Sequence, residues 1–181
     1  MDRETVRSRL LAAGVLLEQW ETGVANTFDD FMDEFIKGET VLVGEGASLM
    51  RQVWVLSLSV YCTVGGKNFE LVEDRQEFAD GRVRHRDKKS AVTEKLLPGE
   101  DPRLAVARAL AEELGLHRFL SCDSQGTRNE VSQSNAFPGL TTEYVLRDYS
   151  VELDPADYRP DGYVEVEEST GITTYFVWRA I

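Results

Sequence analysis

The sequence predicts an α/β chain of the α+β type, in which helices cover a mixed sheet and a helical extension precedes it. Two long β-rich runs, Gln52 to Val64 and Thr141 to Leu153, flank one well-marked helix from Asp101 to Gly115. Two segments with apolar stripes come before the first run. A chain of 181 residues is long enough for one domain plus such an extension.

The N-terminal stripes predict two helices. Residues 2–20 carry apolar side chains near helical spacing, and Asn26 or Thr27 begins a second helix that Gly38 ends. Its acids are expected to be solvated, away from the apolar stripe: Asp29, Asp30, Asp33 and Glu34. We expect residues 1–38 to pack on a main domain of residues 48–181. A homodimer contact or a site for a protein partner is the alternative role for these helices.

Shorter elements are predicted between and after the long runs. Glycines at 44–47 indicate a hinge, and those at 65–66 a turn. Strands are expected at 69–72, 118–122 and 173–178. The polar stretch from Ser124 to Asn135 is expected to be a loop that lies over a site.

Composition excludes several classes of function. The net charge of −12 opposes binding to nucleic acid or to an anionic membrane surface, although a small phosphate-bearing ligand stays compatible with it. No apolar run approaches the roughly 20 residues of a membrane span. Two cysteines and two distant histidines do not indicate a disulfide framework or a zinc site. A reduced, cytoplasmic protein is the expectation.

One basic island interrupts the acidic chain between Arg82 and Lys89. Arginine forms bidentate hydrogen bonds with phosphates and carboxylates, so Arg82, Arg84 and Arg86 are candidate substrate-binding residues. The alternative is a solvent-facing strand edge.

The central helix has clear start and stop signals. Asp101 followed by Pro102 is typical of a helix start, and Gly115 of a helix end. At 100° per residue, one arc is predicted to pack on the sheet: Leu104, Val106, Ala107, Leu110, Ala111 and Leu114. The opposite arc carries Ala105, Arg108, Ala109, Glu112 and Glu113. Taken alone, two adjacent glutamates near a helix end most often form a solvated surface.

The spacing around this helix resembles the box of the Nudix hydrolase superfamily, G-x5-E-x7-R-E-U-x-E-E-x-G-U, in which U is aliphatic. In register, Glu100 takes the first glutamate, Arg108 the arginine, and Glu112 and Glu113 the acidic pair. Leu110, Gly115 and Leu116 match the remaining positions. The resemblance covers about a tenth of the chain and implies a Nudix-like α/β/α sandwich.

Two positions depart from the box. Glu94 stands at the opening glycine, and Ala109 replaces the glutamate that follows the arginine. Alanine cannot bind a metal or accept a proton, so the set lacks one carboxylate. Glu94, Glu143 and Glu165 are the possible replacements.

The resemblance implies Mg²⁺ or Mn²⁺ as cofactor, because the carboxylates of the box hold divalent ions that polarise a diphosphate. It makes Glu112, Glu113 and the backbone carbonyl of Thr93 the expected ligands. Glu100 would brace Arg108 or complete the ligand shell, and the expected catalytic set is Glu100, Arg108, Glu112 and Glu113.

Two functions are therefore open. One is a weak, magnesium-dependent hydrolase of a diphosphate linkage, in which a nucleoside diphosphate is joined to another moiety. The other is a catalytically inactive Nudix fold used for ligand sensing or protein contact. A third reading, isopentenyl diphosphate isomerase, would need a reactive cysteine near the altered glycine, and there is none between Cys62 and Cys122. The sequence does not identify the substrate.

Overall fold

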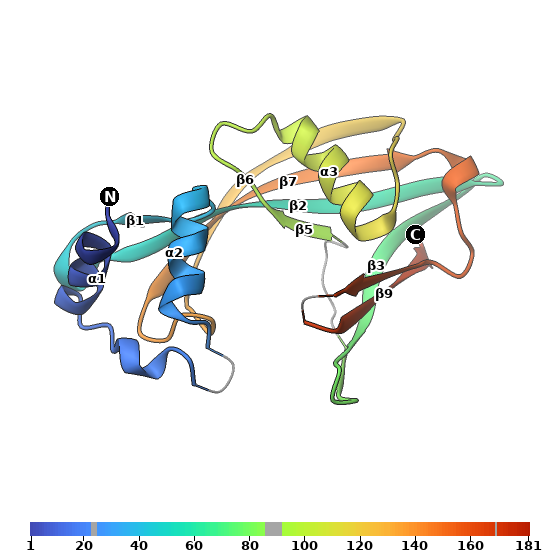
Figure 1. Ribbon diagram of the computed structural model, residues 1–181. Helices are drawn as coiled ribbons and strands as arrows, with labels where there is room; N and C mark the ends of the chain where they lie inside the picture. The colour runs from blue at the N-terminus through green and yellow to red at the C-terminus, as the bar shows by residue number, and fades with distance from the viewer. Residues whose placement is uncertain (23–24, 86–91, 169) are drawn as a thin grey trace. The chain divides into compact units, whose positions relative to one another are not determined.

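The computed structural model describes residues 1–22, 25–85, 92–168 and 170–181 (Figure 1). Its helices are α1 (Arg3–Ala12), α2 (Phe28–Lys37) and α3 (Pro102–Leu114). Its strands are β1 (Val41–Val43), β2 (Met50–Val64), β3 (Lys67–Glu77), β4 (Val83–His85), β5 (Val92–Lys95), β6 (Ser121–Gln133), β7 (Thr141–Leu153), β8 (Tyr163–Glu167) and β9 (Ile172–Ala180). The predicted α+β class, with one large sheet and few helices, is confirmed.

The strands belong to one nine-stranded sheet in this described part of the chain. Its order is β6-β7-β2-β3-β9-β8, while β1 and β5 pair with β2 and β4 pairs with β3. The β2–β3 hairpin is antiparallel and turns at Gly65 and Gly66, whose φ angles of 58° and 76° favour glycine. The turn predicted at this pair is confirmed.

The chain divides into two compact units, and each is described by itself. The first comprises Met1–Val55, Lys95–Gly99 and Arg128–Leu146. The second comprises Leu56–Glu94, Glu100–Thr127 and Arg147–Ile181. Strands β2, β6 and β7 each contribute residues to both.

The core of the first unit is built on aromatic side chains. Trp20, Phe31 and Phe137 are fully buried, and the Trp20 ring lies 5.5 Å from the Phe31 ring and 5.0 Å from the Phe137 ring. Trp20 Nε1 also donates to Pro138 O at 2.9 Å. The N-terminal helices thus share a core with residues more than a hundred positions later, while the predicted boundary between 1–38 and 48–181 stays a prediction.

The first predicted helix is shorter than expected. Helix α1 ends at Ala12, Gly14 adopts φ +82°, and a 3-10 turn follows at Leu17–Gln19. A residue in the left-handed region cannot continue an α-helix, so the apolar spacing of residues 2–20 does not describe one helix. The expectation of a continuous helix was wrong.

The second predicted helix is confirmed with both of its ends. Thr27 and Asp30 form a capping box at the start of α2, and Gly38 ends the helix in the left-handed conformation at φ +77°. A Cβ atom at position 38 would lie 2.6 Å from Pro98 Cγ. Both the backbone angle and this close approach therefore require glycine.

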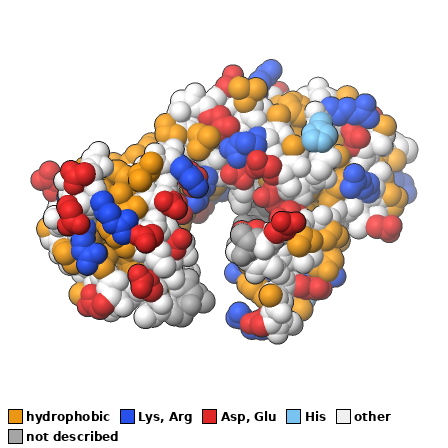
Figure 2. Space-filling model, in the orientation of Figure 1, with side chains coloured by type: hydrophobic (Ala, Val, Ile, Leu, Met, Phe, Trp, Pro, Cys, Tyr) orange, Lys and Arg blue, Asp and Glu red, His pale blue; other side chains and the backbone are white. Residues whose placement is uncertain are grey.

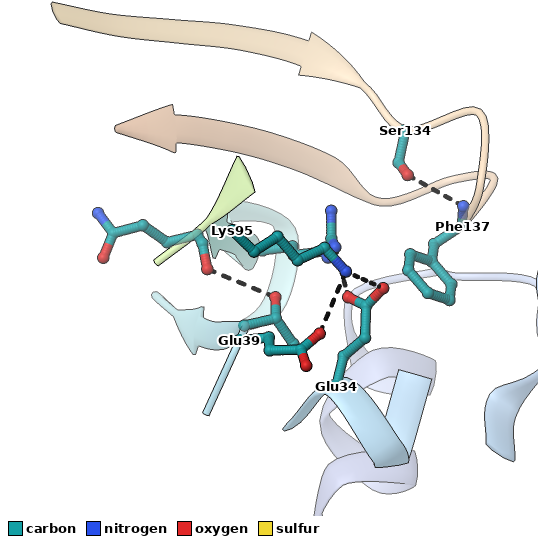
Figure 3. Close-up of polar contacts among 8 residues, drawn as sticks. Glu34, Glu39, Lys95, Ser134 and Phe137 are labelled. Carbon is teal, nitrogen blue, oxygen red and sulfur yellow. Dashed lines mark hydrogen bonds and ion pairs between the residues drawn. The ribbon is translucent and has the colours of Figure 1, made fainter. Parts of the chain in front are cut away.

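One acid of α2 is not solvated, contrary to the prediction. Glu34 accepts hydrogen bonds from Arg51 and from Lys95 Nζ, the latter at 2.7 Å, and Lys95 also reaches Glu39 Oε2 at 3.3 Å (Figure 3). The Arg51 guanidinium lies 5.0 Å from the centre of the Phe137 ring. Burial raises the pKa of Glu34, but these two cations outweigh it and hold the pKa below its ordinary value. Glu34 is therefore directed toward Arg51 of β2 and Lys95 of β5 rather than toward solvent.

The predicted loop from Ser124 to Asn135 is instead most of strand β6, so that expectation was wrong. Leu120 N–H donates to Glu152 O and Ser134 N–H to Leu140 O, which makes β6 and β7 antiparallel. Nearly every β6 residue is exposed. Exposure on both faces removes the alternation of apolar and polar residues by which a strand is predicted. The strand expected at 118–122 overlaps only its beginning.

Two further observations concern the chain as a whole. Cys62 and Cys122 are free thiols, both buried within the second unit. In the described residues, no helix combines the length and apolar character that crossing a membrane requires.

Candidate functional site

Helix α3 begins and ends as predicted. Asp101 accepts a hydrogen bond from Arg103 N at 2.8 Å, and Gly115 closes the helix at φ +67°. The buried face differs from the prediction, since Leu104 is 67% exposed whereas Ala105 and Ala109 are fully buried. The buried face of α3 therefore consists of two alanines together with Val106, Leu110 and Leu114.

Arg108 gathers the acids of the box. Its Nη2 lies 3.1 Å from Glu100 Oε2, and its Nε lies 3.3 Å from Glu100 Oε1. Its Nη1 lies 3.1 Å from Glu94 Oε1 and 3.4 Å from Glu112 Oε2. The hydrogen bonds with Glu100, and then those with Glu94, raise the pKa of Arg108. Of the two roles expected of Glu100, the structure shows the contact with Arg108, and Arg108 also contacts Glu112.

Glu113 lies on the same helix in a different environment. Burial, followed by the charges of Glu165, Glu94, Glu112 and Glu167, raises its pKa to about 7. Helix α3 packs against β8, the strand that supplies Glu165 and Glu167. The pKa of Glu165 is also raised, first by burial and then by Glu167. Near neutral pH the Glu113 carboxyl therefore shares its environment with an excess of like charge.

The three replacement acids named from the sequence have different surroundings. Glu94 and Glu165 act on Glu113, whereas Glu143 lies in the first unit. There Glu143 accepts hydrogen bonds from Gln52 at 2.7 Å and from Asn129 at 2.9 Å. The geometry thus favours Glu94 and Glu165 as members of the site.

Sequence reasoning missed Glu167. The signal was present, because Glu165 and Glu167 are two positions apart in a strand and so project to the same side. No strand was expected there, and the alternation was not used.

The donor chemistry of this cluster suits a hard divalent cation, since every side chain but Arg108 is a carboxylate. Within the ranges that the structure describes, no three His, Cys, Asp or Glu side chains converge closely enough to hold a metal. Mg²⁺ commonly uses only one or two carboxylates and takes its other ligands from water and substrate phosphates. The residues therefore fit such an ion in combination with a phosphate-bearing ligand, and do not form a complete cage.

The basic island is only partly described. Arg82 pairs with Asp80 at 2.6 Å, and Arg84 donates to Gln76. Both guanidinium groups lie over the Phe78 ring, at 5.1 Å and 5.3 Å from its centre. Arg86 lies outside the described residues. The exposed strand β4 fits the strand-edge alternative, and the substrate-binding role of these arginines stays a prediction.

Comparison with known proteins gives matches among solved structures alone. No family model matches the sequence, and no curated protein matches it. The Ap4A hydrolase of C. elegans is 16% identical, with 70% of this chain and 79% of that chain covered and a TM-score of 0.35. The Nudix domain of Shewanella oneidensis NrtR, solved with ADP-ribose, is 10% identical, with 82% of each chain covered and a TM-score of 0.42.

A Nudix hydrolase from Nitrosomonas europaea is 22% identical, with 68% of this chain and 70% of that chain covered and a TM-score of 0.32. Two of these three structures are named as Nudix proteins, the superfamily that the box around α3 resembles. Every overlap has a TM-score below 0.5, so the site is judged on its own residues and geometry.

Proposed function

We propose that this chain is a weak, divalent-cation-dependent hydrolase of a diphosphate linkage, acting on a nucleoside diphosphate joined to another moiety in the cytoplasm. One observation carries the proposal. The charges of Glu112, of Glu94 from β5, and of Glu165 and Glu167 from β8 all act on the box acid Glu113. Figure 2 shows acidic side chains, in red, gathered beside α3. Such a concentration of carboxylates favours the binding of a divalent cation, which would relieve their mutual repulsion.

In this proposal Glu112, Glu113 and the Thr93 backbone carbonyl would hold Mg²⁺ or Mn²⁺. When bound, the ion would polarise the diphosphate and lower the pKa of a water molecule. Arg108 is kept charged by Glu100 and Glu94, and it also contacts the exposed Glu112 carboxylate. Burial, followed by the surrounding negative charge, raises the pKa of Glu113 to about 7, so this carboxyl would lose its proton as the ion binds.

Weak activity follows from one position. Ala109 supplies no carboxylate and is fully buried. A general base worth roughly 10²–10⁴-fold in rate is therefore absent from this position. In this proposal Glu94 or Glu165, whose charges act on Glu113, would serve in its place.

A catalytically inactive module for ligand sensing or protein contact is the second candidate. It is favoured by buried Ala109 and by the absence of a three-ligand group among the described side chains. The two candidates share ligand and cation binding and differ in turnover.

Calorimetric titration with Mn²⁺ and Mg²⁺, alone and with ADP-ribose or a nucleoside diphosphate, tests cation binding. We expect binding at millimolar cation or below that Glu113→Gln and Glu112→Gln weaken at least about tenfold. The matched control is Asp161→Asn, which removes an exposed carboxylate of the same unit. No binding at millimolar cation would exclude the hydrolase.

Chromatography of the nucleotide products then separates the two candidates. Slow release of a nucleoside monophosphate, dependent on cation and lost in Glu113→Gln, supports the hydrolase. Binding of ligand and cation without any product over many hours supports the inactive module.

A further inference from the structure

Strand β6 forms one end of the sheet order, and the pairing that the structure describes for it is with β7 alone. From Asp123 to Gln133 all of its residues are exposed. A long edge strand presents a row of backbone donors and acceptors to any strand that approaches it. The chain therefore carries an open edge of unusual length.

One backbone hydrogen bond just beyond the end of β6 indicates which backbone groups of the strand face this edge. Ser134 N–H donates to Leu140 O, toward the β7 side. Because backbone groups alternate in direction along a regular strand, those of Asn129 and Val131 are expected to point away from β7. An antiparallel strand added at the edge would hydrogen-bond at these odd-numbered positions.

The side chains on either side of Asn129 carry opposite charges. Arg128 and Glu130 lie two residues apart on one face of β6 and form an ion pair with each other. An antiparallel second strand of the same sequence, centred on Asn129, sets Arg128 opposite Glu130 of the second copy and Glu130 opposite Arg128 of the second copy. Residues 128 and 130 then form the pairs without backbone hydrogen bonds, in which facing side chains come closest.

The neighbouring registers are unfavourable. Centring the pair on residue 128 sets Arg128 opposite its own copy, and centring it on residue 130 does the same for Glu130. Like charges directly opposite each other destabilise a strand pair. A shift by a single residue would mismatch the hydrogen-bonding positions. The sequence of β6 is thus complementary to itself in one register.

We propose that a second copy of this chain binds along the edge of β6, antiparallel and centred on Asn129. The arrangement is a closed two-fold dimer with the same surface on both copies. It covers Val131, which is 61% exposed, by pairing it with Thr127 of the second copy. This surface is distinct from the N-terminal helices and independent of the proposed hydrolase activity.

The dimer is expected to be weak. A strand edge buries far less than the roughly 1,200 Å² of a standard interface. Each copy also carries a net charge of −12, so two copies repel each other. Salt at 0.15 M reduces this repulsion because it shortens the screening length to about 8 Å. A dissociation constant on the order of 100 μM is expected at that ionic strength.

Sedimentation velocity of the full chain between about 10 μM and 1 mM tests the proposal. The wild type should shift from monomer to dimer over this range. Arg128→Glu and Glu130→Arg should each weaken the dimer at least about tenfold, because two-fold symmetry repeats every substitution. An equimolar mixture of the two variants should form a heterodimer. In that pair the acid introduced at position 128 of one chain faces the base introduced at position 130 of the other, while the second facing pair keeps its native residues.

Two further variants act as controls. Lys67→Glu makes the same change of net charge as Arg128→Glu, at an exposed position of β3, and should leave the dimer intact. Val131→Pro removes a backbone donor at the open edge and should abolish the dimer while circular dichroism stays unchanged. A wild type that is monomeric at about 1 mM, a dimer that persists in both charge variants, a mixture that stays monomeric, or an equal loss in Lys67→Glu would each overturn the proposal.

Discussion

Arg108 Nη2 lies 3.1 Å from Glu100 Oε2, and this pair ties the middle of α3 to the residue just before the helix cap at Asp101. The same guanidinium also holds Glu94 and Glu112. Removing it would leave three carboxylates facing one another. The arginine of the box therefore has a structural task whether or not the site turns over a substrate.

Arg108→Ala should destabilise the protein by about 2 kcal/mol, because half-buried acids lose their shared cation. Arg108→Lys should recover only part of this loss, since an ammonium group cannot form the forked contact with Glu100. Urea unfolding measures both values. Arg103→Ala removes an exposed arginine of the same helix and should change stability by less than about 0.5 kcal/mol. Equal losses at 103 and 108 would contradict this assignment.

Stability should fall as pH rises from about 4.5 to about 7. The pKa of Glu113 is 4.5 in its ordinary state and about 7 in the folded chain, so the folded state binds more protons within this window. The protonated form is favoured by folding, and the benefit is lost as pH passes the folded pKa. Since Glu113 is only partly buried, we expect about 1 kcal/mol after discounting for solvent screening.

Glu113→Gln should remove this dependence of the free energy of unfolding on pH and make the protein more stable than wild type above about pH 7. Urea unfolding at closely spaced pH values measures the difference between the two proteins. Asp161→Asn should follow the wild-type curve. A difference between wild type and Glu113→Gln that does not change with pH would contradict the raised pKa.

Ala109→Glu restores the glutamate that the box has after its arginine, but it should lower stability by about 2–3 kcal/mol. The Ala109 side chain is fully buried, so a carboxylate placed there is desolvated. Thermal unfolding measures the loss, with Ala109→Gln separating the effect of size from that of charge. A stable variant with faster cation-dependent hydrolysis would instead show that the site can admit the missing carboxylate.

Glu34→Gln should destabilise the first unit by about 3 kcal/mol. Arg51 is 4% exposed, and its Nε has no hydrogen-bond partner within the described structure even in the wild type. Neutralising Glu34 removes the carboxylate that balances this buried charge. Asp33→Asn, on the exposed side of α2, is the control and should be nearly neutral. Indistinguishable denaturation curves for the two variants would refute the role of Glu34.

Local sequence signals were sufficient to predict the helices whose ends are marked by capping residues and glycines. The caps at Thr27 and Asp101, and the glycines at 38 and 115, placed α2 and α3 because each cap acts within one turn of its helix. The spacing of Arg108 from Glu100 and Glu112 was readable for the same reason. Contacts made across a turn or two leave a trace in one short stretch of sequence.

Long-range effects were not readable. Strand β6 is stabilised by its pairing with β7 and has little apolar pattern of its own. Glu34 appeared to be a surface acid because its partners Arg51 and Lys95 lie far along the chain. Ala109 was assigned to the polar arc by helical geometry, but the packing of α3 turns that side inward. These three errors arose where a distant element decided the environment, whereas the early end of α1 at Gly14 has a local cause.

The two buried thiols provide a chemical reporter of local opening. Burial raises the pKa of both Cys62 and Cys122, so reaction with an alkylating reagent requires their surroundings to open. Both lie in the second unit, and the sequence contains no other cysteine. The labelling rate of the unmodified chain would thus follow the opening of the unit that holds α3 and would be blind to the unit that holds Trp20. Trp178 also lies in the second unit, whereas Trp20 and Trp54 lie in the first. Comparing the labelling rate with the tryptophan fluorescence of a Trp178→Phe variant during unfolding would tell whether the two units open together or in sequence.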